Sequence, residues 1–136
     1  MNIVVPTTDP SGFTARVDFR FSRAPFLTLV KVVGGELKEA TAVPNPAVNA
    51  PGGAGPMAAQ KAAEMGANVV LAPRLGPNAT AALQALGIQV FTVPPGITVK
   101  EAVEMYLRGQ LQPMPAFGFG RGMGMGRGRG RGGGWG

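Results

Sequence analysis

Three short segments of the chain carry residue types that bind anions. In chain order they are Arg20-Phe21-Ser22-Arg23-Ala24-Pro25, Gly52-Gly53-Ala54-Gly55-Pro56 and Leu75-Gly76-Pro77-Asn78. The first supplies two guanidinium groups, and each of the others leads into a predicted helix whose first turn leaves backbone N–H groups unpaired. We predict one anion site formed by Arg20, Phe21, Ser22, Arg23, Gly52, Gly53, Ala54, Gly55, Gly76 and Asn78, with Phe21 and Phe26 packed beneath it.

The elements that must position these segments are a series of strands and helices. Gly34-Gly35 separates two strand-like runs, which predicts a hairpin. Thr98 with Glu101 matches a capping box, and Pro56 suits the first position of another helix. Apolar and β-branched runs predict strands over 3–5, 26–33, 36–43, 69–72 and 88–93, and helical spacing predicts helices over 57–65, 78–86 and 99–107.

This order of elements predicts an α/β fold with three layers, α/β/α. Right-handed crossovers make the later strands parallel, and the hairpin makes its two strands antiparallel. We therefore expect a five-stranded mixed sheet in the order 3-2-1-4-5 with strand 2 antiparallel, which is the ribonuclease H-like motif. In that topology the three segments meet at the rim where strands 1 and 4 end, and open α/β sheets bind ligands at such a rim.

Each segment taken alone also has a purely structural interpretation. Gly52 to Gly55 can be a flexible turn, Gly76-Pro77 a common helix start, and the two arginines solvated surface; their expected convergence favours binding. The chain has no cysteine and no histidine, which excludes thiolate or imidazole ligands and nucleophiles. A nuclease of this fold needs carboxylates on strands 1 and 4. Residues 3–5 and 69–72 contain none, so we predict a protein that is not an enzyme.

Composition divides the 136 residues into a body, 1–112, and a tail, 113–136, joined by a linker at Pro113 and Pro115. Hydrophobic residues make up 45% of the chain, enough for one core. The net charge of +6 owes much to Arg121, Arg127, Arg129 and Arg131. Glycine at every second position from Phe117 to Gly132 predicts a disordered tail, because ordering it costs too much backbone entropy. We expect the protein in the cytoplasm, since the sequence shows no signal peptide and no membrane span. We also expect a monomer.

The tail leaves three interpretations open. Its Arg-Gly repeats with nearby phenylalanines are typical of segments that bind RNA without sequence preference, so an RNA- or DNA-associated protein is the alternative function. A solubilising extension without a ligand is the simpler interpretation. Thirdly, Met123 and Met125, with Met114, offer soft thioether donors for Cu(I).

The same three segments resemble a known family. Phe21-Ser22-Arg23-Ala24-Pro25-Phe26, Gly52 to Pro56 followed by Ala59-Gln60, and Leu75-Gly76-Pro77-Asn78-Ala79 are similar to motifs of the dinitrogenase iron–molybdenum cofactor biosynthesis accessory family. The resemblance covers residues 1–111. It implies a carrier or scaffold for an anionic metal–sulfur cluster, of the iron–molybdenum cofactor precursor or molybdenum–copper sulfide type. A cluster donor or acceptor protein would then be its partner.

Two positions depart from that family's pattern. Arg20 and Pro51 stand where many members have histidine. Without histidine or cysteine, the usual protein ligands of an iron cluster are missing. The resemblance therefore implies either a preassembled, molybdenum-containing sulfide cluster that is held non-covalently, or a member that has lost cluster binding.

Overall fold

The computed structural model describes residues 1–114. The predicted tail disorder, the four tail arginines on which nucleic-acid binding depends, and the Met123–Met125 pair lie outside the described residues. In chain order the elements are β1 (Asn2–Thr7), the 3-10 helix η1 (Gly12–Thr14), β2 (Phe26–Val33), β3 (Glu36–Pro44), α1 (Ala54–Glu64), β4 (Val69–Ala72), α2 (Pro77–Ala85), β5 (Gln89–Thr92), α3 (Val99–Leu107) and β6 (Gln112–Pro113).

The strands form one mixed sheet in the order β3-β2-β1-β4-β5-β6. β2 runs antiparallel to both β1 and β3, while β1, β4 and β5 are parallel. The predicted order of the first five strands and the antiparallel second strand are confirmed. The Gly34-Gly35 hairpin is also confirmed, because both glycines have the positive φ values, 61° and 80°, that a tight hairpin turn requires.

The predicted count of five strands is wrong, because β6 pairs antiparallel with Phe91 and Thr92 of β5. The sequence analysis assigned Pro113 to a linker. Proline has no N–H to donate, but the next N–H, of Met114, bonds the Val90 carbonyl at 2.8 Å. Pro113 thus occupies a position whose N–H is not needed by the ladder. A strand of two residues is too short to show an alternation of apolar and polar residues, so it can be recognised only from its pairing with β5.

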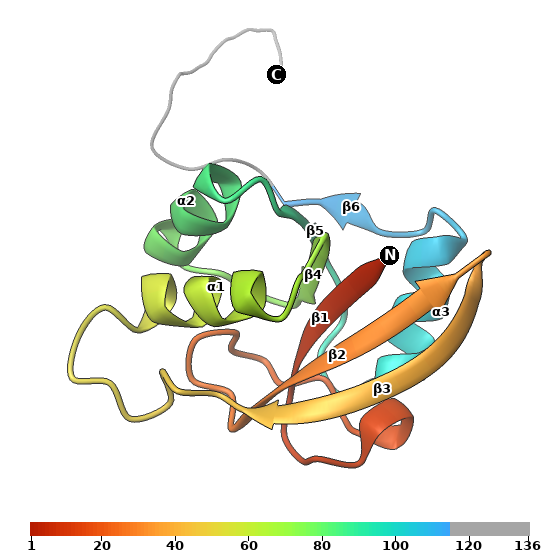
Figure 1. Cartoon of the computed structure of the whole chain (residues 1–136), viewed down its shortest axis with the longest axis horizontal. Coiled ribbons are helices and arrows are strands. Elements are labelled where there is room, and N and C mark those ends of the chain that lie inside the picture. The colour runs from red at the N-terminus through yellow and green to blue at the C-terminus, as the bar shows by residue number, and fades with distance from the viewer. Residues whose placement is uncertain (115–136) are drawn as a thin grey trace, which may run out of the picture.

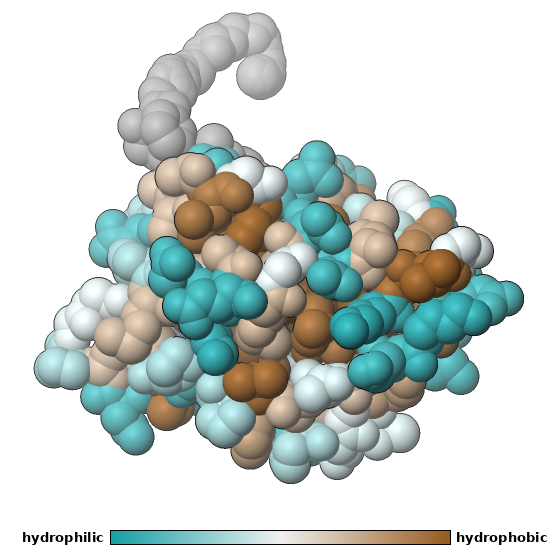
Figure 2. Space-filling view, in the orientation of Figure 1, coloured by the Kyte–Doolittle hydropathy of each residue, from teal (hydrophilic) through white to brown (hydrophobic). Residues whose placement is uncertain are grey.

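Helices cover both faces of the sheet. α1 and α2 lie together on one face, and α3 lies on the other with η1 (Figure 1). β1 shows why both faces are buried: Val4 packs into the cluster under α1 and α2, whereas Ile3 and Val5 pack into the cluster under α3. Alternate side chains of a strand point to opposite faces, so this central strand is apolar throughout. On the side of the molecule that Figure 2 shows, apolar surface patches are interleaved with hydrophilic residues.

The first helix begins earlier than predicted. α1 starts at Ala54, with Gly53 as its N-cap at φ 69°, and the Met57 N–H bonds the Gly53 carbonyl at 3.0 Å. Pro56 therefore lies inside the first turn, and the expected glycine loop supplies Ala54 and Gly55 to the helix. The prediction failed because Gly55 has a poor intrinsic preference for helix that tertiary packing overrides.

The capping box of α3 is confirmed and makes stability depend on pH. Glu101 accepts hydrogen bonds from the Thr98 N–H at 2.9 Å and from its hydroxyl at 3.1 Å. The backbone bond, followed by the hydroxyl, holds the pKa of Glu101 below its ordinary 4.5. A carboxylate with a lowered pKa stabilises the fold above the unfolded-state pKa, and this contribution is lost as the pH falls through the folded-state pKa.

We therefore expect Glu101→Gln to lower the free energy of unfolding at pH 7 and to have a smaller effect at pH 3. The variant keeps a hydrogen-bonding oxygen but carries no charge near the positive helix N-terminus. Urea unfolding of wild type and variant at both pH values measures the difference. If the unfolding free energies of wild type and variant differ by the same amount at pH 7 and at pH 3, this role for the Glu101 charge is contradicted.

Candidate functional site

A hollow of about 180 Å³ opens between two of the predicted segments. We call it the arginine hollow; its lining residues are Arg20, Phe21, Ser22, Arg23, Arg74, Leu75 and Gly76. The first segment precedes β2, which is antiparallel to β1, and Arg74 to Gly76 follow the carboxyl end of β4. Both therefore reach the same edge of the sheet, as the topology predicted.

Arg74 was missed by the sequence analysis, which began the third segment one residue too late. Its guanidinium carbon lies 5.8 Å from the ring centroid of Phe19, a cation–π distance. The signal was present, since a third arginine directly precedes Leu75. The structure thus lines the hollow with three cationic side chains rather than the two predicted.

Arg20 is positioned by Asp18. The Arg20 N–H donates to Asp18 Oδ1 at 2.8 Å, and Arg20 Nε lies 3.8 Å from the same oxygen. The Asp18 side chain is 8% exposed and that of Arg20 is 60% exposed. The buried carboxylate therefore anchors one end of the arginine, and most of the side chain remains accessible to a ligand.

Arg23 has a structural role in addition to its place in the hollow. Its Nη1 donates to three carbonyls of one loop, those of Ala47 at 3.3 Å, Val48 at 3.2 Å and Ala50 at 2.8 Å. These bonds tie the first segment to the loop that leads into α1. Arg23 consequently brings charge to the hollow from a fixed position.

Asn45, which the sequence analysis did not single out, joins the same two parts of the chain. Its buried amide donates to the carbonyls of Phe21 at 3.3 Å, Ser22 at 3.2 Å and Ala24 at 2.9 Å. Its Oδ1 accepts the Ala47 N–H at 3.0 Å. The only sequence signal was its setting, Pro44-Asn45-Pro46, which is typical of a turn.

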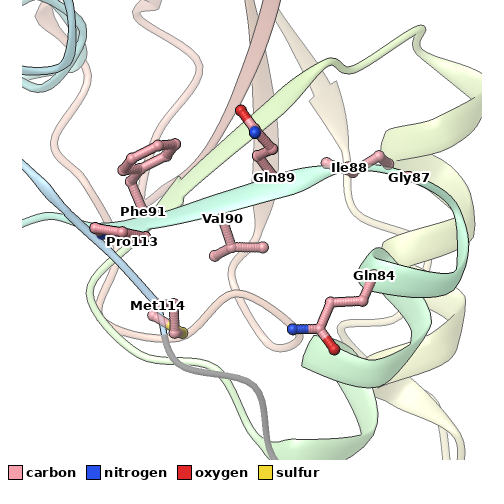
Figure 3. Close-up of a pocket in the computed structure, with 8 residues that line it drawn as sticks. All are labelled: Gln84, Gly87, Ile88, Gln89, Val90, Phe91, Pro113 and Met114. Carbon is pink, nitrogen blue, oxygen red and sulfur yellow. The ribbon is translucent and has the colours of Figure 1, made fainter. Parts of the chain in front are cut away.

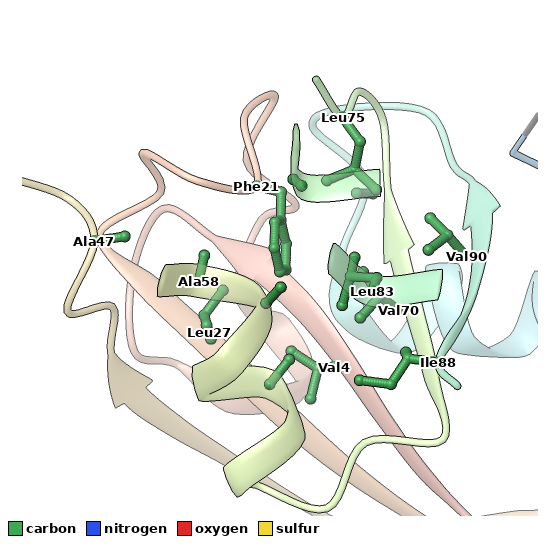
Figure 4. Close-up of a cluster of buried hydrophobic side chains, with 14 of the residues drawn as sticks. Val4, Phe21, Leu27, Ala47, Ala58, Val70, Leu75, Leu83, Ile88 and Val90 are labelled. Carbon is green, nitrogen blue, oxygen red and sulfur yellow. The ribbon is translucent and has the colours of Figure 1, made fainter. Parts of the chain in front are cut away.

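Phe21 belongs to the core beneath the hollow. It is 1% exposed and packs in the cluster formed by β1, α1, α2 and their neighbours, where Leu75 and Ala58 also lie (Figure 4). Phe26, predicted to lie beside it, is half-buried at the start of β2 and is not among the residues that line the hollow. One aromatic residue therefore supports the site from below.

The glycine segment does not line the hollow. A Cβ added to Gly55 would lie 2.9 Å from the Ala79 nitrogen, so the first turns of α1 and α2 touch there. Gly52, Gly53 and Asn78 are exposed, and Ala54 is buried. Of the ten predicted site residues, the structure gathers Arg20, Phe21, Ser22, Arg23 and Gly76 in one hollow, whereas Gly52, Gly53, Ala54, Gly55 and Asn78 do not line it.

A second hollow, of about 380 Å³, has a different character. Val90 points from β5 toward Met114 and Gln84, whereas Gln89 and Phe91 point to the other side of the strand (Figure 3). Among residues 1–114, none of those that line it is charged. These residues therefore offer an anion no charge complementarity.

The donor set of residues 1–114 does not suit direct coordination of a metal ion. Within that range there is no group of three or more histidine, cysteine, aspartate or glutamate side chains that could hold one. What the arginine hollow offers is positive charge and hydrogen-bond donors, which fit an anion that brings its own metal ligands. None of the helices described for residues 1–114 combines the length and apolar character needed to cross a bilayer.

Comparison with protein families identifies the chain. The family model for dinitrogenase iron-molybdenum cofactor matches residues 1–109, a range that includes every residue of the arginine hollow. The chain belongs to this family. The resemblance predicted from the three segments is confirmed.

Three proteins illustrate what the chain is similar to. The apo form of the orange protein from Desulfovibrio gigas is 37% identical, with a TM-score of 0.75 over 85% of this chain and 93% of that one. A Thermotoga protein solved by NMR is 26% identical, with a TM-score of 0.69 over 87% of this chain and 97% of that one. An uncharacterised Methanocaldococcus jannaschii protein is 29% identical over 71% of this chain and 81% of its own length.

Proposed function

We propose that this family member is a non-enzymatic carrier or scaffold that holds a preassembled anionic metal–sulfur cluster non-covalently in the arginine hollow. The cluster would be of the iron–molybdenum cofactor precursor or molybdenum–copper sulfide type. The observation that carries the proposal is the set of three arginines, Arg20, Arg23 and Arg74, around one hollow at the carboxyl edge of the sheet. Family membership and the likeness to the orange protein support the choice of ligand.

The arrangement suits a ligand that is already complete. A sulfide cluster carries its own metal ligands, so the protein needs to supply only charge, N–H donors and apolar cover. Each arginine has a partner that limits its movement: Asp18 for Arg20, loop carbonyls for Arg23 and the Phe19 ring for Arg74. Little side-chain entropy is then lost on binding.

The neighbouring helix starts extend the proposed site. The first turns of α1 and α2 meet at Gly55 and Ala79, and helix N-termini favour negative charge. Gly52, Gly53, Ala54, Gly55 and Asn78 would therefore face the outer part of a cluster larger than the hollow. The proposal includes a monomeric, cytoplasmic chain that exchanges its cluster with a donor or acceptor protein.

Titration with tetrathiomolybdate and Cu(I) tests the proposal. We expect a visible charge-transfer band and amide shifts concentrated in residues 20–23 and 74–76. The double variant Arg20→Gln/Arg74→Gln should bind roughly tenfold to a hundredfold more weakly, because two charge-assisted contacts are lost. Arg108→Gln, an exposed arginine at the end of α3, is the matched control and should bind as wild type does. Equal affinity of the double variant and the control would refute the site.

A further inference from the structure

An apolar groove of about 570 Å³ adjoins the arginine hollow. Apolar residues form most of its lining, among them Phe19, Val93, Pro94, Pro95, Met105 and Leu111. Pro73 directly follows β4, and Val93 directly follows β5, so the groove lies at the carboxyl ends of parallel strands. Open α/β sheets place ligands there, and the volume is in the range of small-molecule sites, about 300–1,000 Å³. We call it the proline groove.

Phe19 is held in an exposed position at this groove. It is 50% exposed, whereas its neighbours at two-residue spacing, Val17 and Phe21, are 2% and 1% exposed. Hydrogen bonds on either side fix the backbone, since the Asp18 N–H donates to the Pro6 carbonyl and the Arg20 N–H to Asp18 Oδ1. An exposed aromatic ring in a rigid setting is apolar surface that a ligand can cover at little cost in entropy.

A contact between Phe19 and Arg74 links the linings of the two cavities. Phe19 lines the proline groove, Arg74 lines the arginine hollow, and the two side chains are in cation–π contact. No carboxylate lines either cavity in the part of the chain that the structure describes. An apolar cavity and a cationic one thus meet at one pair of contacting side chains.

We propose that the chain has a site for a small organic phosphate, with the phosphate in the arginine hollow and a flat apolar body in the proline groove. Arginine suits phosphate because its planar fork donates two parallel hydrogen bonds. Thr92, Gln110 and Gln112 line the groove and offer hydrogen bonds to polar edges of the body. The proline groove is preferred over the 380 Å³ hollow beside β6 because the groove adjoins Arg74, whereas the described residues that line the hollow are uncharged. This inference shares arginines with the proposed function and does not require a cluster.

Phenyl phosphate, inorganic phosphate and phenol are the probes, titrated into the full chain and followed by amide shifts. We expect phenyl phosphate to bind about tenfold more tightly than inorganic phosphate, because the ring buries apolar surface. Its shifts should include residues of both cavities, and phenol alone should bind more weakly than either anion. Equal affinity for phenyl phosphate and inorganic phosphate would overturn the proposal.

Variants separate the two cavities. Phe19→Ser should remove the tenfold advantage of phenyl phosphate over inorganic phosphate. Arg74→Gln should weaken the binding of both. Val33→Ser, which changes another exposed apolar residue at the hairpin, is the matched control and should keep the advantage. An unchanged advantage in Phe19→Ser would refute the groove. Tetrathiomolybdate has no apolar body and should bind whether or not the groove is a site. If wild type binds tetrathiomolybdate but shows no preference for phenyl phosphate over inorganic phosphate, this inference is rejected and the carrier function is retained.

Discussion

Replacing Asn45 with alanine should destabilise the protein by about 3 kcal/mol, because a buried hydrogen-bonding group disappears while its partners stay buried. The Asn45 side chain joins three carbonyls of the first segment to the N–H of Ala47. Alanine makes none of these bonds. The carbonyls of Phe21 and Ala24, both residues being buried, would then lack the donor that replaces water.

Thermal and urea unfolding measure this effect, with Asn49→Ala as the control. Asn49 lies four residues further along the same loop and is exposed, so the same chemical change there should cost less than about 0.5 kcal/mol, the usual effect of a surface substitution. At temperatures where the Asn45→Ala variant is still folded, it should also bind tetrathiomolybdate more weakly than wild type, because Asn45 orders the segment that contains Arg20 and Arg23. Equal stability of the two variants would contradict the role assigned to Asn45.

Replacing Gly55 with alanine should cost roughly 2 kcal/mol, although the same change in an exposed helix usually stabilises by about 1 kcal/mol. The added Cβ would lie 2.9 Å from the Ala79 nitrogen and 3.2 Å from its Cα and Cβ. These atoms belong to the first turn of α2, which can move only by shifting the helix. The gain in helix preference is therefore smaller than the cost of separating α1 from α2.

Gly52→Ala is the matched control, since a Cβ there meets nothing within 4 Å. Its stability should lie within about 0.5 kcal/mol of wild type. Urea unfolding of the two variants shows whether glycine is required at position 55 because α1 closely approaches α2 there, or whether glycine is required throughout this segment. A Gly55→Ala protein as stable as wild type would show that the helices can move apart freely. In that case the contact between the two helix starts would not constrain the site.

Local patterns were sufficient to predict most of the fold. The strands at 26–33 and 69–72 match β2 and β4 residue for residue, and the hairpin and the α3 capping box are where the sequence places them. These features depend on neighbours in the chain: β-branched runs, two glycines with positive φ, and a threonine three residues before a glutamate. The strand order then followed from the handedness of crossovers.

The site depended on contacts between residues far apart in the sequence. Sequence reasoning brought the first and third segments to one edge and found Arg20 and Arg23, but it missed Arg74, which the structure places in the lining of the hollow. Asn45 bonds residues 21 to 24 positions away, and Arg23 bonds residues 24 to 27 positions away. No local periodicity encodes such partners.

Local sequence was enough to assign the first five strands and the three helices, apart from some of their ends, because backbone preference and apolar spacing act over a few residues. Tertiary structure alone decided which carbonyls Arg23 bonds, how closely Gly55 approaches Ala79, and whether Gln112–Pro113 forms a strand. In each case the free energy comes from a partner that the chain brings into contact only after folding. The elements were therefore predictable, and the lining of the arginine hollow required the assembled sheet.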